Sequence, residues 1–96
     1  GREMMRVTAL KEVGESQAKL ASARRSLELY KEAILLQSEL AFRSALAAYQ
    51  TGRVEFFTLL EAQRALRDAR MGYFKAQVNV LQSLADLERA VGKDLS

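Results

Sequence analysis

Apolar residues recur along the chain at the three-and-four spacing of helices that each bury one face. In the first half, one line repeats every seven residues and a second line fills the alternate positions: Val13, Leu20, Leu27, Ile34, Ala41 and Ala48, then Ala9, Ser16, Ala23 and Tyr30. The second half continues the spacing at Phe56, Leu59, Leu66, Tyr73, Val80, Leu84, Leu87 and Val91, with Gln63, Arg70 and Gln77 interrupting. This heptad pattern predicts two long helices packed as a coiled coil.

Glycine marks the one clear break between the two helices, since the chain contains no proline. Gly14 and Gly72 lie inside helix-forming stretches, where each costs about 1 kcal/mol without ending a helix. Gly52 follows a helical stretch and precedes Val54, so it suits the left-handed residue that ends a helix. Glu55 then suits the positive end of a new helix.

These signals predict an all-α fold, a long antiparallel helical hairpin in a single domain. We expect a first helix over residues 3–51, a turn over 51–54 and a second helix over 54–91. Gly92 is expected to end the second helix and to start a tail over residues 92–96.

Apolar and small residues extend beyond the main heptad line. On the second helix a further line holds small residues only: Ala62, Ala69, Ala76, Ser83 and Ala90. Additional apolar residues lie off the main line, at Leu29, Leu36, Leu40, Phe42, Leu46, Phe57, Leu60, Phe74, Val78 and Leu81. Helices with such a wide apolar arc need neighbours on two sides. Two architectures satisfy this need, a four-helix bundle made by two hairpins and a wall of helices.

Charge and composition argue against most chemical functions. Fifteen basic and twelve acidic residues give a net charge of +3, spread evenly over both halves, whereas nucleic-acid binders concentrate positive charge on one stripe. Histidine and cysteine are absent, which excludes disulfides, Cys/His zinc sites and histidine-based triads. No catalytic constellation emerges, so we expect no enzyme, no cofactor and no metal site. No apolar run is longer than the five residues Ala45 to Tyr49, far below the ~18–20 that cross a bilayer.

Charged side chains are otherwise expected on a solvated face. Three pairs have the i,i+4 spacing of helical ion pairs: Arg24 with Glu28, Glu39 with Arg43, and Arg64 with Asp68. A ladder of the same spacing is formed by Lys11, Glu15 and Lys19. Arg64, Arg67 and Arg70 form a small basic cluster, which is either part of that face or a contact for a phosphate or lipid headgroup. Met4 and Met5 are adjacent and therefore point in different directions, which is a weak basis for a soft-metal site.

The turn and the residues after it carry the most distinctive pattern. Tyr49 precedes Gly52, and Phe56 and Phe57 follow at the start of the second helix. Aromatic residues at such a tip either pack locally or contact another molecule.

This segment resembles the outer membrane efflux protein family, the TolC-like outer membrane factors. The family's pattern at the tip of its periplasmic hairpin is matched in order by Tyr49, Gly52, Leu60, Glu61, Ala62, Gln63 and Leu66. The flanks are similar as well, from Leu27 to Tyr30 before the tip and from Leu84 to Gly92 at the end of the second helix.

The resemblance implies a fragment of a trimeric channel, with a β-barrel in the cell outer membrane and an α-helical barrel in the periplasm. This chain would be the second of two hairpins of the α-barrel, within the periplasm. The tip would bind the helical hairpin of a periplasmic adaptor (membrane fusion) protein, and through it an inner-membrane transporter, in a tripartite pump. Tyr49, Gly52 and Arg53 would form the tip, and Glu61 would lie in an acidic ring at the channel's constriction. Export would be passive conduction without catalysis.

Two positions depart from the family's pattern. Leu36 stands where many relatives carry proline, which predicts a straighter first helix. Thr58 stands where some relatives carry a second acidic residue, so a charged gate would depend on Glu61 alone. The alternative from the residues themselves is a free-standing helical hairpin that acts as a scaffold for partner helices. In either case we expect the isolated chain to self-associate, as an antiparallel four-helix arrangement.

Overall fold

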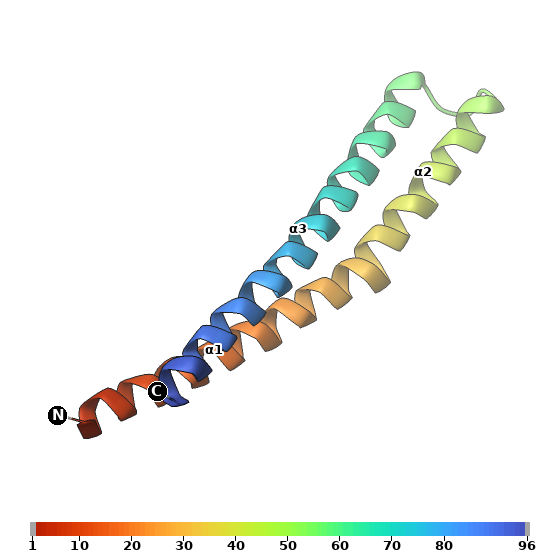
Figure 1. Cartoon of the computed structure of the whole chain (residues 1–96). Helices are drawn as coiled ribbons and strands as arrows, with labels where there is room; N and C mark the ends of the chain where they lie inside the picture. Colours follow the sequence, from red (N-terminus) through yellow and green to blue (C-terminus); the bar gives the residue numbers. More distant parts are fainter. Residues whose placement is uncertain (1, 96) are drawn as a thin grey trace. The chain divides into compact units, whose positions relative to one another are not determined.

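The computed structural model describes residues 2–95, and every element in this range is helical. Helix α1 spans Arg2–Leu29, the π-helical segment η1 spans Tyr30–Ile34, α2 spans Leu35–Gln50 and α3 spans Phe56–Leu95 (Figure 1). The two long helical stretches are therefore joined by residues 51–55 alone. The all-α helical-hairpin prediction is confirmed, and within residues 2–95 no strand is present.

The turn after α2 ends the helix by its own hydrogen bonds. Gly52 has a φ of 73°, the left-handed conformation that glycine adopts without steric cost. The Arg53 amide donates to the Ala48 carbonyl at 2.8 Å and the Gly52 amide donates to the Tyr49 carbonyl at 3.0 Å. These two bonds define a Schellman motif, which caps carbonyls that the helix end would leave unpaired. The role predicted for Gly52 is confirmed.

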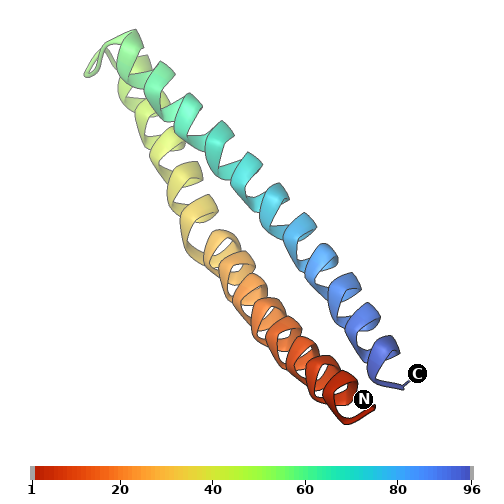
Figure 2. The same ribbon diagram turned by 90° about the vertical axis from the view of Figure 1, so that its left-hand side faces the viewer.

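The chain divides into two compact units, which we call the terminal unit (residues 1–27 and 76–96) and the tip unit (residues 28–75). In the terminal unit the start of α1 lies beside the end of α3 (Figure 2). Lys19 pairs with Asp86 and Glu12 pairs with Lys93, so a step of seven residues along α1 matches a step of seven back along α3. The two helical segments of this unit are therefore antiparallel.

Small residues fill the interior of the terminal unit. The buried residues are Ala9, Leu20 and Ala23 of α1 and Ala76, Ser83 and Ala90 of α3. The small-residue line predicted on the second helix thus faces the first helix, which allows close approach of the two backbones. Ser83 is 1% exposed, and its hydroxyl has no hydrogen-bond partner.

The tip unit contains η1, α2 and the first half of α3. Leu66 and Ala69 of α3 are buried, and α2 covers them with half-buried side chains, among them Ser38, Phe42 and Ala45. This unit is therefore a short helical hairpin closed by the turn at Gly52.

The π-helical segment corrects the prediction of one uninterrupted first helix. Before it, the inward positions are those expected, such as Leu20, Leu27 and Tyr30. After it, Phe42 is half-buried whereas the predicted heptad residue Ala41 is exposed. A π turn holds one more residue than an α turn, so every later side chain moves one position round the helix. Of the two heptad residues predicted beyond Ile34, Ala41 is therefore misplaced, whereas Ala48 is half-buried as expected.

The second helix also extends further than predicted. It continues through Gly92 to Leu95, whereas the sequence suggested an end at Val91. Gly52 has the only positive φ among the described residues, so Gly92 keeps a helical backbone. A glycine ends a helix when its backbone is left-handed and the amides that follow bond the last carbonyls of the helix. Among the described glycines, Gly52 alone has this conformation. None of the helices in residues 2–95 is long and apolar enough to cross a membrane.

Candidate partner-binding site at the helical turn

Side-chain hydrogen bonds hold the turn between α2 and α3 in one conformation. The Thr51 hydroxyl lies 3.1 Å from the Ala47 carbonyl and 3.2 Å from the Ala48 carbonyl, both within donating distance. Arg53 Nε donates to Thr51 Oγ1 at 3.1 Å. The Arg53 side chain is thereby anchored at its base, while the residue remains exposed at the surface.

An aromatic contact joins the end of α2 to the start of α3 across the same turn. The rings of Tyr49 and Phe56 lie 5.7 Å apart between centroids, at 60° to one another, in an edge-to-face arrangement. This contact supports the expectation of local packing at the tip. Phe57 has no such contact and is 60% exposed. Phe56 thus makes a local ring contact and still remains 57% exposed, so both phenylalanines present apolar surface at the tip.

The structure brings together three of the four predicted site residues. Tyr49, Gly52 and Arg53 meet within the turn and its hydrogen bonds. Glu61 lies in the second turn of α3, exposed, and no described contact joins it to the other three. The tip and the position of Glu61 are therefore separate features of the tip unit.

A close contact deeper in the tip unit was missed by the sequence reasoning. The Tyr30 ring lies against the backbone of Gly72, and a Cβ at Gly72 would come within 2.4 Å of Tyr30 Cε1 and 2.7 Å of its Cζ and hydroxyl oxygen. Gly72 therefore provides the space for this side chain. The available signal was a glycine inside a long helix, which usually has a packing reason.

The ion pairs expected along the helices form only in part. Lys11 pairs with Glu15 at 4.0 Å along α1, as the predicted ladder requires, whereas none of the other three predicted i,i+4 pairs is formed in the described chain. Those three pairs were expected from spacing alone, and exposed partners gain too little to hold two long side chains together.

The strongest charge cluster lies in the terminal unit around Asp86. This carboxylate accepts a hydrogen bond from Arg89 and lies 3.5 Å from Lys19 Nζ. The hydrogen bond from Arg89, with a smaller contribution from Lys19, holds the pKa of Asp86 below its usual value of 3.8, against the opposing effect of partial burial. The cluster therefore links α1 to α3.

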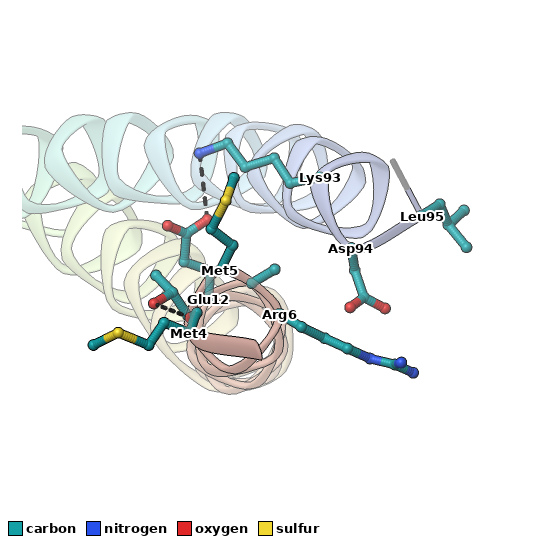
Figure 3. Close-up of a pocket in the computed structure, with 9 residues that line it drawn as sticks. Met4, Met5, Arg6, Glu12, Lys93, Asp94 and Leu95 are labelled. Carbon is teal, nitrogen blue, oxygen red and sulfur yellow. Dashed lines mark hydrogen bonds and ion pairs between the residues drawn. The ribbon is translucent and has the colours of Figure 1, made fainter. Parts of the chain in front are cut away.

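A groove lies at the ends of the terminal unit. It has a volume of about 890 Å³ and is lined by the first turns of α1 and the last residues of α3, beside the ion pair of Lys93 with Glu12 at 3.3 Å (Figure 3). Met4 and Met5 line it and point in different directions, as their adjacency predicts (Figure 3). Over the described residues, no three carboxylate, histidine or cysteine side chains cluster as a metal site would require.

Comparison with known proteins identifies the family. The model of the family "Outer membrane efflux protein" matches residues 2–93. The chain belongs to the outer membrane efflux protein family. The resemblance drawn from the residues around the turn is thereby confirmed.

Comparison with one curated relative shows how much of such a protein this chain represents. The cobalt-zinc-cadmium resistance protein CzcC of Cupriavidus metallidurans is 28% identical over 74 residues, which is 77% of this chain and 18% of that protein. The chain thus spans about a fifth of the length of this relative. No solved structure matches the chain.

Proposed function

We propose that this chain is a periplasmic hairpin of an outer membrane export channel, and that its turn docks a periplasmic adaptor protein. The observation that carries the proposal is the turn itself. Its backbone is closed by the Schellman motif, and the same turn presents Arg53 and Phe57 outward on a fixed base. A tip with exposed arginine and phenylalanine offers residue types that are enriched at protein interfaces.

The other parts of the proposal follow from family membership. The whole protein assembles as a homotrimer in the cell outer membrane, with this segment in the periplasm, and the adaptor connects it to an inner-membrane transporter. The hairpin forms part of the wall of the export channel and binds the adaptor protein, and it catalyses no reaction. Glu61 lines the narrow end of the channel, where its carboxylate favours cations.

A crosslinking experiment tests the docking. The chain contains no cysteine, so Arg53→Cys in the full-length protein introduces one thiol in this segment. A short crosslinker in intact cells is expected to join this thiol to a periplasmic adaptor. Arg25→Cys, on the exposed surface of α1, is the matched control and is expected to capture nothing. Capture at Arg25 without capture at Arg53 would mean lateral docking and would overturn the tip proposal.

The role of Glu61 has a separate test. Glu61→Gln in the full-length channel removes one carboxylate per subunit, and we expect a lower preference for cations in planar-bilayer recordings. Glu55→Gln is the control, because it removes an exposed carboxylate from the turn itself. Unchanged ion selectivity in the Glu61 variant would exclude this residue from the lining of the channel.

The alternative is a scaffold that binds partner helices without forming a channel. Absence of capture at both cysteines, together with no channel activity of the full-length protein, would favour it.

A further inference from the structure

Four arginines gather around one groove of the tip unit. The groove has a volume of about 690 Å³ and is lined by Arg43 of α2 and by Arg64, Arg67 and Arg70 of α3. All four arginines are exposed, so their guanidinium groups are accessible from solvent. Leu60 and Leu66 also line the groove, the first half-buried and the second buried. The groove therefore combines basic walls with an apolar base.

The positive charge of this groove is not neutralised by the described part of the chain. Among residues 2–95 none of the four arginines forms an ion pair, although Glu39 and Asp68 have the spacing to pair with two of them. Glu39 is the one described carboxylate that lines the groove. Four arginines and one glutamate leave an excess of three positive charges, which equals the net charge of the whole chain. The fold thus concentrates in one groove an excess that the sequence shows as evenly spread.

Arginine walls of this kind favour phosphate as the bound group. A planar guanidinium donates two parallel hydrogen bonds to a phosphate and is only weakly hydrated, so it gives up water readily. A groove lined by charges of one sign also raises the local concentration of ions of the opposite sign. A single exposed ion pair contributes little, so several arginines have to act on the same anion.

The spacing of the arginines indicates how many phosphates fit. Arg64, Arg67 and Arg70 follow one another at i,i+3, so their Cα atoms are spread over about 9 Å along α3. One phosphate is held by donors that converge on a point, whereas phosphates in a row meet donors that follow a line. The spacing therefore favours an anion with more than one phosphate.

We propose that this groove binds a small anion with two or three phosphate groups, held by Arg64, Arg67 and Arg70 on the α3 side and by Arg43 on the α2 side. A soluble oligophosphate and a lipid headgroup with two phosphates offer the same chemistry. The inference does not rest on docking at the turn, because it uses only side chains of the groove.

A titration of the 96-residue chain with sodium tripolyphosphate tests the proposal. The readout is the chemical shift of the arginine Nε–Hε resonances in NMR spectra, which reports each arginine separately. We expect saturable shifts of the four groove arginines, with a Kd of about 0.1–1 mM at about 50 mM NaCl, that weaken as salt is raised. Arg24 and Arg25, which are exposed on α1, should not shift. Orthophosphate should bind about tenfold more weakly, because it meets fewer of the four arginines.

Variants with opposite expected effects separate the groove from general positive charge. Arg64→Gln/Arg67→Gln should weaken tripolyphosphate binding about five- to tenfold. Glu39→Gln should strengthen it about two- to threefold, because it removes the negative charge that lines the groove. Arg24→Gln/Arg25→Gln removes two charges elsewhere and should leave the Kd within about twofold. Circular dichroism checks that each variant keeps its helicity.

Cosedimentation with vesicles distinguishes the two sources of phosphate. The vesicles are phosphatidylcholine with either cardiolipin, which has two phosphates in one headgroup, or phosphatidylglycerol at equal total phosphate. Binding that prefers cardiolipin and is lost in Arg64→Gln/Arg67→Gln, with tripolyphosphate binding much weaker than expected, would assign the groove to a lipid headgroup. Arginine-dependent binding of tripolyphosphate without binding of either vesicle would assign it to a soluble anion. Both results support the proposal.

Three outcomes would overturn it. They are binding of neither tripolyphosphate, up to about 10 mM, nor cardiolipin vesicles, equal affinity of the groove variant and the Arg24→Gln/Arg25→Gln control, and equal affinity for orthophosphate and tripolyphosphate. Failure of the crosslink at Arg53→Cys, with arginine-dependent phosphate binding intact, would remove the docking at the turn and leave this inference standing.

Discussion

Three glycines of this chain lie within helices, and they differ in what surrounds them. Gly72 lies under the Tyr30 ring, whereas a Cβ at Gly14 or Gly92 would meet nothing within 4 Å. At Gly72 the absence of a side chain makes room for the Tyr30 ring and so favours the folded state. At Gly14 and Gly92 it makes no such room and only lowers helix propensity. Sequence alone gives each of them the same cost, because it does not show which glycine has a neighbour above it.

Substitution of these glycines gives a direct prediction. Gly72→Ala should destabilise the chain by about 1–3 kcal/mol, because the new methyl group overlaps the Tyr30 ring. Gly92→Ala is the matched control and should stabilise α3 by up to about 1 kcal/mol, since alanine is the better helix former. Thermal unfolding followed by circular dichroism measures both.

A double-mutant cycle identifies the cause of the loss at Gly72. In the background of Tyr30→Ala, the cost of Gly72→Ala should largely disappear, because the overlapping ring is gone. Equal costs of Gly72→Ala in the two backgrounds would show that Tyr30 is not the reason for the glycine.

At the scale of elements, the extra residue of the π turn in η1 changes which side chains of α2 face inward. It inserts one extra residue between a segment with Leu20 and Leu27 inward and a segment with Phe42 inward. Removal of one residue from η1 should therefore leave the inward positions on both sides in one continuous heptad.

This argument predicts that a deletion is tolerated. Deletion of Glu32, an exposed residue of η1, should change the melting temperature little or raise it, because the π turn becomes an ordinary α turn. Deletion of Arg43 in α2 is the control and should be strongly destabilising, since it rotates the residues between it and the turn away from α3. A large loss of stability on deletion of Glu32 would mean that the π turn is required for packing.

The ion pairs around Asp86 make the terminal unit sensitive to acid. The folded pKa of Asp86 is lowered, so its contribution is fully present above the ordinary value of 3.8 and is lost as pH falls below it. We expect the melting temperature to fall more steeply below about pH 4 in the native chain than in Asp86→Asn. Parallel curves for the two proteins would show that the cluster adds nothing to stability.

The elements were largely predictable from the sequence, and their details were not. Hydrophobic period and the glycine turn were enough for two helices and for the left-handed Gly52. The seven-residue period was extended through Ile34 because counting residues assumes a uniform α-helix. The π turn at Tyr30–Ile34 could not be foreseen, since no residue type marks it in the sequence. The site was predictable in part, as the tip motif located Tyr49, Gly52 and Arg53. The contact of Tyr30 with Gly72 depends on two residues far apart in sequence, which the pattern of one helix does not show.

At the scale of the whole molecule, much apolar surface remains uncovered. Large exposed side chains occur in every helix, among them Leu29, Leu36, Leu40, Phe57, Phe74 and Leu81. A wide apolar arc of this kind is covered by neighbouring helices in larger assemblies. The second apolar surface noted in the sequence is therefore present in the folded chain.

We accordingly predict that the isolated chain self-associates. Sedimentation at ~100 μM should show dimers or larger species, because two hairpins together bury surface that one leaves exposed. Phe74→Gln/Leu81→Gln removes two exposed apolar side chains of α3 and should weaken the association without loss of helicity. A monomeric, fully helical native chain at this concentration would contradict the prediction.

The closed hydrogen bonding of the turn has a consequence for how such tips diversify. The Schellman motif and Thr51 satisfy carbonyls at the end of α2 from within the chain, so the tip presents side chains rather than open backbone groups. An exposed residue that makes no hydrogen bond within the turn, such as Phe57, can then be exchanged without a change in the loop. Substitutions at such positions are therefore expected to alter the surface of the tip while its backbone stays the same.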